Sequence, residues 1–208
     1  MLHRLSENIA DYFFDENDKY PKEVYKYGIE LTISSVLGTL MIIITGIISG
    51  YVIEAFIFMI ILSSIRFFTG GYHANTYLMC NAITLIAIIF SLISYLLIKS
   101  MLSSAVLVSV MLTVMLSLVI TIIWLCPIEN KNKLIPQEDR LKFKIISLVM
   151  VLIITFVCIF LYVQIDFEQV LIMIPTMIVV NISILAEIKN NKKRGVRNEF
   201  KNKHEESC

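Results

Sequence analysis

The 208-residue chain is 57% hydrophobic and 17% charged, with a mean hydropathy of +0.78. Soluble domains are less apolar and carry about a quarter charged residues, so a single soluble core is excluded. The net charge of +1 does not indicate a nucleic-acid partner, and we expect none. The four cysteines form no C-x-x-C pair, so neither a zinc site nor a disulfide framework is predicted, and we expect no metal or cofactor.

The first apolar pattern predicts a short amphipathic helix over residues 2–14, lying in the membrane interface. A loop around residues 15–21 and a polar lead-in from Lys22 to Glu30 follow. We expect one membrane-embedded domain over residues 1–208. Its parts are a lead-in at 1–28, a transmembrane region at 31–187 and a basic tail at 188–208.

Long apolar stretches then follow one another along the chain. They are Leu31–Ser49, Tyr51–Ile65, Asn81–Ile98, Ser103–Leu125, Ile145–Val163 and Val170–Ala186. A spanning helix needs about 20 apolar residues, so the second stretch is marginal and could be tilted or partly broken. Because backbone polar groups find no other partners in hydrocarbon, every stretch should be helical. The fold class is therefore all-α, a polytopic membrane protein with six transmembrane helices.

Basic residues gather on one side of this topology. Seventeen of the 18 Lys and Arg residues lie in the two tails, in the loop 127–144 and at Arg66, and only Lys99 lies on the other side. The positive-inside rule then predicts that both termini and the segment Arg66–Cys80 are cytoplasmic.

The segment between the second and third stretches carries the chemistry. It contains a Gly70-Gly71 pair, then His73, and Cys80 seven residues after that histidine. A cysteine thiolate is a nucleophile, and an imidazole can accept its proton and return it to a leaving amine. This is the minimal equipment for acyl transfer.

Helix geometry limits how the pair can meet. Seven residues on an unbroken helix separate two Cα atoms by about 10.5 Å, too far for proton transfer. His73 should therefore lie outside the helix that carries Cys80, on a turn at the glycine pair. Asn75 or Thr76 is then the expected N-cap of that helix. A purely structural histidine and an inert cysteine remain the alternative.

The run Arg66, Gly70-Gly71-Tyr72-His73-Ala74 and Cys80, with the basic loop after Cys126-Pro127, resembles the accessory gene regulator protein B (AgrB) family of bacterial quorum sensing. The resemblance implies that His73 is the catalytic base and Cys80 the nucleophile of a membrane cysteine endopeptidase. Its substrate would be an AgrD-like propeptide, which loses its C-terminal tail and forms a thiolactone or lactone ring. The resemblance also implies a homodimer in the bacterial cell membrane.

Other residues receive weaker roles. Asn75 and the backbone amides of Gly70 and Gly71 are oxyanion candidates by position. Arg66 either positions the substrate or simply extends its side chain to the interface. The basic residues Lys131, Lys133 and Arg140 either hold an acidic substrate tail or only set topology and touch anionic lipid.

The remaining candidate residues lie within the apolar stretches or beside them, except Cys208, which ends the basic tail. Glu54 is expected to reach the outer headgroups, and Pro175 to kink the last span. Cys126, Cys158 and Cys208 are interpreted as bystanders. The rival functions are a small transporter and an export or assembly factor without peptidase activity.

Overall fold

The computed structural model describes residues 22–70, 76–101, 103–128 and 137–205, together with Glu7, Ile9 and Tyr12. The described part is helical, and six of its helices are long and apolar enough to cross a membrane. The predicted fold class of a polytopic all-α membrane protein is confirmed. The predicted interfacial helix over residues 2–14 lies almost wholly outside the described residues, although Glu7, Ile9 and Tyr12 are each helical.

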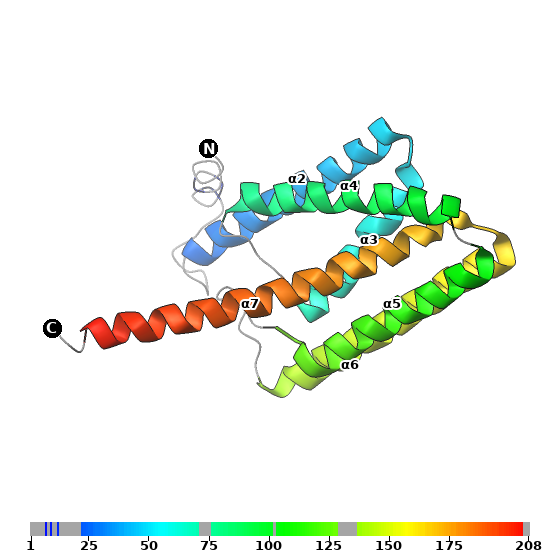
Figure 1. The fold of residues 1–208 in the computed structure, drawn as a ribbon. Helices are drawn as coiled ribbons and strands as arrows, with labels where there is room; N and C mark the ends of the chain where they lie inside the picture. The colour runs from blue at the N-terminus through cyan, green and yellow to red at the C-terminus, as the bar shows by residue number, and fades with distance from the viewer. Residues whose placement is uncertain are drawn as a thin grey trace.

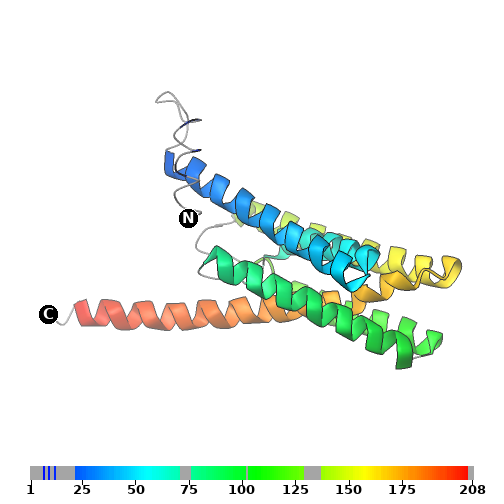
Figure 2. The same cartoon turned by 90° about the horizontal axis from the view of Figure 1, so that it is seen from above.

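The helices pack in three layers (Figures 1 and 2). Helices α3 (Val52–Thr69) and α7 (Met173–Glu205) form the middle. Helices α2 (Lys22–Ser49) and α4 (Tyr77–Met101) lie on one side, and α5 (Ser104–Leu125) and α6 (Gln137–Ile165) on the other. In an 18-residue window of the last span, Glu168–Lys192, 56% of residues are buried, and 39% in that of α3, against 17–22% elsewhere. The two central helices are therefore shielded by protein, and the other four present apolar side chains outward.

Several boundaries differ from those predicted. The lead-in Lys22–Glu30 is part of α2, and the marginal second stretch is one unbroken helix that continues to Thr69. Arg66 therefore lies within the last turn of α3 and not in a loop. Apolar length marks the hydrocarbon-facing part of a helix, but a helix continues past it wherever its backbone groups stay paired.

The last helix also differs from expectation. A short 3-10 helix, η1 (Glu168–Ile172), precedes α7, so Pro175 lies in the first turn of α7. Proline is tolerated there because a first-turn residue needs no intrahelical N–H donor, so Pro175 lies near the start of the last span, just after the change from 3-10 to α-helix. The predicted basic tail continues α7 as helix to Glu205, beyond the other helices (Figure 1).

The end of the bundle remote from Cys80 is closed by tight turns. Gly50, at φ +78°, ends α2, and the Tyr51 amide donates to the Gly46 carbonyl at 2.9 Å. A Cβ at Gly46 would lie 2.7 Å from the Ala55 Cβ, so glycine there lets α2 and α3 approach closely. Asp166, at φ 54°, makes the corresponding turn after α6.

Candidate functional site

Cys80 lies in the first turn of α4, and Thr76 caps that helix. The Thr76 hydroxyl accepts a hydrogen bond from the Met79 amide at 3.3 Å, and the Thr76 carbonyl accepts one from the Cys80 amide at 3.1 Å. The predicted cap at Asn75 or Thr76 is thus confirmed for Thr76. Cys80 is a free thiol and half-buried. Because helical side chains lean toward the N-terminus, its sulfur is directed toward the start of the helix.

The other half of the predicted pair belongs to the segment between α3 and α4. His73, Gly71 and Asn75 lie outside the described residues, as do Lys131 and Lys133. The structure does show that the His73 segment connects Gly70, at the end of α3, with Thr76, at the start of α4. The helix that carries Cys80 begins at Tyr77, after His73 in the chain. His73 and Cys80 therefore do not lie on one unbroken helix, as the spacing argument requires.

Gly70 joins the start of this segment to the end of α5. Its backbone, at φ 75° and ψ −166°, occupies a region that only glycine adopts readily. A Cβ there would lie 2.7 Å from the Ile128 carbonyl oxygen. The Ile128 amide donates to the Thr69 carbonyl at 3.1 Å. The two connections that carry His73 and the basic residues 131 and 133 are therefore anchored to each other.

The backbone amide of Gly70 already donates a hydrogen bond within the protein. It donates to the Arg66 carbonyl at 3.1 Å, which completes the C-terminal turn of α3. An oxyanion role for this amide would require that bond to break, so the geometry does not favour it. The other oxyanion candidates, Gly71 and Asn75, lie outside the described residues.

Arg66 lines an apolar groove of about 470 Å³ between α3, α4 and α7. The groove also contains Ile83 and Thr84, one turn beyond Cys80, and the Thr84 hydroxyl donates to the Cys80 carbonyl at 3.1 Å. Deeper walls come from Ala87 and Phe90. The sequence reasoning missed this groove because only the packing of three helices creates it.

A second, more polar pocket of about 310 Å³ lies between the end of α5 and the start of α6. Arg140 and Lys144 line it together with Trp124 and Cys126. The two cations are four residues apart and so lie on one face of α6. Arg140 is thus placed at the same end of the bundle as Cys80, but Cys80 does not line this pocket.

Cys126 is buried in that pocket's wall, and burial raises the pKa of its thiol to about 12, against a smaller lowering by Lys144. A thiol of this kind remains protonated near neutral pH and is a poor nucleophile. Cys158 is also buried, within α6. These observations favour Cys80 as the reactive cysteine of the described chain.

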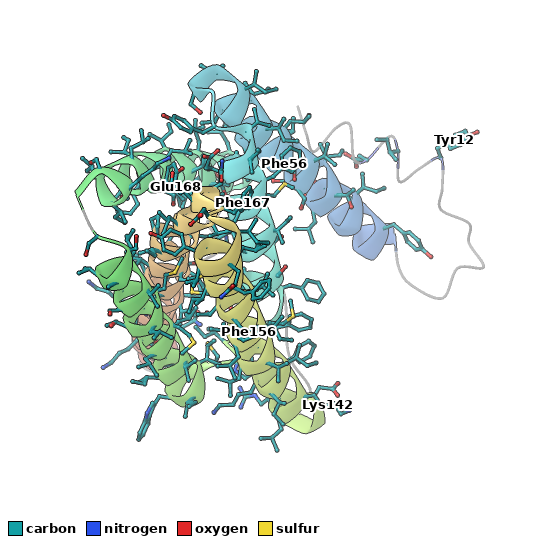
Figure 3. All side chains as sticks on the ribbon, turned by 90° about the vertical axis from the view of Figure 1, so that its right-hand side faces the viewer. Tyr12, Phe56, Lys142, Phe156, Phe167 and Glu168 are labelled. Carbon is teal, nitrogen blue, oxygen red and sulfur yellow. The ribbon has the colours of Figure 1, made fainter. Side chains whose placement is uncertain are left out.

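Glu54 is placed differently from the prediction. It is 6% exposed in the first turn of α3, and the Tyr95 hydroxyl of α4 forms a hydrogen bond with it. Nearby, Lys99 of α4 pairs with Glu168 of η1. Figure 3 views this end, with Glu168 and Phe167 close to the end of α4. Glu54 therefore joins helices at the end remote from Cys80 and does not extend to the headgroups.

Known proteins resemble this chain over most of its length. The family model described as accessory gene regulator B matches residues 6–188. A Clostridium perfringens protein (strain 13 / Type A) named "Putative AgrB-like protein 2" is 30% identical over 148 residues, 68% of each chain. Another, from strain SM101 and named "Putative AgrB-like protein", is 26% identical over the same share of each chain. No solved structure matches.

Proposed function

Because the chain belongs to the accessory gene regulator B family, a role in quorum-sensing processing follows, and we propose that it is a membrane cysteine endopeptidase. It would remove the C-terminal tail of an AgrD-like propeptide and promote closure of a thiolactone or lactone ring. The observation that carries this proposal is a half-buried thiol in the capped first turn of α4, directly after the segment that contains His73.

The first chemical step forms an acyl-enzyme. His73 accepts the thiol proton of Cys80, and the sulfur attacks the carbonyl carbon at the cleavage point. The carbon–nitrogen bond breaks as His73 returns the proton to the leaving amine. The products are a thioester on Cys80 and a tail fragment with a free amino end.

The second step releases the signal. A cysteine thiol or serine hydroxyl within the bound propeptide attacks the thioester carbonyl, and a ring closes. Cys80 leaves as thiolate and regains a proton. The exchange of one thioester for another is nearly balanced, so loss of the tail fragment or export of the ring must draw the reaction forward.

The location of the site agrees with this chemistry. Of the basic residues that the structure describes, all but Lys99 belong to the end of the bundle that contains Cys80, which the positive-inside rule assigns to the cytoplasm. Arg140 and Lys144, which line one pocket at this end, would attract an acidic propeptide tail. The propeptide would then bind from the cytoplasm with its tail near α6.

Co-expression with the short open reading frame beside this gene tests the proposal. Cys80→Ala and His73→Ala should each abolish tail removal, measured by mass spectrometry of the peptide products in cells and medium. Cys158→Ala is the matched control, since it removes a buried thiol from another helix and should leave processing intact. Tail removal by the Cys80→Ala protein would refute the proposal. Processing-independent export of the intact peptide would favour the rival export factor.

A further inference from the structure

The pocket between the end of α5 and the start of α6 combines two cations with an exposed tryptophan. Arg140 and Lys144 both line it, and their spacing of four residues makes them neighbours on the surface of α6. Trp124, the only tryptophan of the chain, lines the same pocket and is 80% exposed. The pocket therefore offers two positive charges beside an aromatic ring at the molecular surface.

The charges of this pocket favour an anion. Among the described residues, no acidic side chain lines it, and the carboxylate of Asp139 instead accepts a hydrogen bond from Lys142 at 2.9 Å. Burial raises the pKa of the Cys126 thiol, and the charge of Lys144 opposes that rise, so the ammonium group acts on the pocket wall. Arg140 also takes part in another interaction, but a guanidinium carries several N–H donors and can bind an anion as well.

The pocket lies at the depth where the two helices leave the hydrocarbon. The span of α5 ends at Leu125, and that of α6 begins at Asp139, beside α5 (Figure 1). Leu125 and Leu141 line the pocket with exposed apolar side chains, and exposed Ile145 follows one turn later on α6. Tryptophan is enriched at this depth because its ring is apolar and its N–H group is polar. An anion in the pocket is therefore next to the acyl chains of the bilayer.

We infer that this pocket binds the phosphate group of an anionic phospholipid from the leaflet on the Cys80 side of the membrane. The phosphate lies between Arg140 and Lys144, and the acyl chains follow the exposed apolar side chains of α5 and α6. The volume of about 310 Å³ is at the lower end of the range for ligand pockets, so it suits a headgroup and not a whole lipid. Basic pockets between spanning helices bind anionic headgroups in this way. The inference goes beyond the proposed function and does not depend on it.

Inorganic phosphate and the acidic tail of a propeptide carry the same kind of charge. Neither accounts for the exposed apolar surfaces of Trp124 and Leu141, which the glycerol backbone and acyl chains of a lipid cover. Attraction of a tail to this end of the bundle acts over a distance and does not require the tail to occupy the pocket. Occupancy by either anion is therefore an outcome of the test.

Fluorescence of Trp124 reports on this pocket alone, because the chain has no other tryptophan. The full-length protein is reconstituted in mixed vesicles of phosphatidylglycerol, which has a net negative charge, and zwitterionic phosphatidylcholine. In one series the acyl chains of phosphatidylglycerol carry bromine, and in the other those of phosphatidylcholine do. Bromine quenches tryptophan fluorescence at short range, so the two series give the ratio of the binding constants of the two lipids beside Trp124.

The wild-type protein should favour phosphatidylglycerol at least about fivefold at low salt, because each cation near the surface attracts anionic lipid. Arg140→Gln and Lys144→Gln should each lower the ratio at least about twofold, and the double variant should bring it close to one. Lys142→Gln is the matched control, since it removes the same charge from the same part of α6. The Lys142 side chain is 73% exposed and outside the pocket lining, so the ratio should stay within about 1.5-fold of the wild type.

Three results would overturn the inference. Equal quenching by the two lipids in the wild type would mean that Trp124 contacts only unselected boundary lipid. An equal loss in Lys142→Gln and Lys144→Gln would mean that the surface charge acts as a whole. Loss of the preference on addition of inorganic phosphate or hexaglutamate, at constant ionic strength, would assign the pocket to a soluble anion or to an acidic peptide tail.

The outcome is independent of the peptidase reaction. If the double variant does not fold, as judged by its circular dichroism melting curve, the two single variants and Lys142→Gln decide the question. The measurement uses neither a propeptide nor Cys80, so failure here is distinct from failure of the proposed function, which shows as tail removal by the Cys80→Ala protein.

Discussion

The two ends of the helical bundle are built differently. At the end remote from Cys80, α2 and α3 are joined by Gly50 and Tyr51 alone, and α4 and α5 by residues 102 and 103. Side chains there link helices directly, through Glu54 with Tyr95 and Lys99 with Glu168. At the Cys80 end the connections between helices are longer, over residues 70–76 and 126–136.

The Cys80 end is held mainly by backbone and aromatic contacts. The Ile128 amide bonds to the Thr69 carbonyl, and the rings of Phe68 and Phe143 lie 6.0 Å apart between α3 and α6. The two ends of the bundle are therefore held together by different kinds of contact. Among the described residues, side chains tie the helices together at the remote end, and a backbone hydrogen bond and an aromatic contact do so at the Cys80 end.

The largest expected contrast lies between two cysteines at the Cys80 end. The pKa of Cys126 is raised from 9.0 to about 12, so near pH 8 its thiolate fraction falls about a thousandfold below that of an ordinary thiol. Alkylation of Cys126 by iodoacetamide should be slower by that factor and should rise about tenfold per pH unit toward pH 12. Half-buried Cys80 should be labelled much faster than Cys126, as measured by peptide mass spectrometry. Equal labelling of both cysteines at pH 8 would contradict the assigned roles.

Gly70→Ala tests the backbone junction at the same end. The substitution forces a non-glycine residue into a backbone region that costs about 1–3 kcal/mol, and its Cβ meets the Ile128 oxygen. Tail removal should fall about 5- to 150-fold, the factor that corresponds to about 1–3 kcal/mol, if the site must hold this geometry. Gly28→Ala is the control, because a Cβ there meets nothing within 4 Å. Unchanged processing by Gly70→Ala would show that the junction does not position the site.

Some features of the fold could be predicted from the sequence, and they share one property. Hydrocarbon requires long apolar helices, so six spans and the turn at Gly50 were predictable from the pattern of residues. The capped start of the Cys80 helix was predictable because threonine caps helices through a local hydrogen bond. These features depend on residues close together in the chain.

Features that depend on distant residues were missed. The groove needs three helices, and the contact of Gly70 with Ile128 joins positions 58 residues apart. Glu54 was assigned to the headgroups because its partner Tyr95 lies on another helix. A signal for the remote end did exist, since Lys99 is the lone basic residue predicted on that side, and the acidic Glu168 lies in the connection between the last two apolar stretches.

Tyr95→Phe tests the remote end. The Tyr95 hydroxyl forms a hydrogen bond with buried Glu54. Its removal leaves the buried Glu54 side chain with one hydrogen bond fewer, which should lower the free energy of unfolding by about 1–3 kcal/mol. The Tm in detergent should fall. The alkylation rate of Cys80 should stay within about twofold of the wild-type rate at temperatures where the protein is folded, because distant sites are only weakly coupled. Tyr162→Phe, at a half-buried position of α6, is the control. A large change in Cys80 reactivity would show that the two ends are coupled.

The smallest effect is expected for the ion pair between Lys99 and Glu168. Both side chains are nearly half exposed, so solvent screens the pair and it contributes about 0–1 kcal/mol. Lys99→Met and Glu168→Gln should each lower the Tm only slightly, and the double variant should lose no more than the sum of the single losses. A coupling energy well above about 1 kcal/mol in this double-mutant cycle would mean that the pair is shielded from water in the membrane. If that coupling energy also exceeded the loss caused by Tyr95→Phe, the ion pair, and not the buried bond between Glu54 and Tyr95, would be the main tie at the remote end.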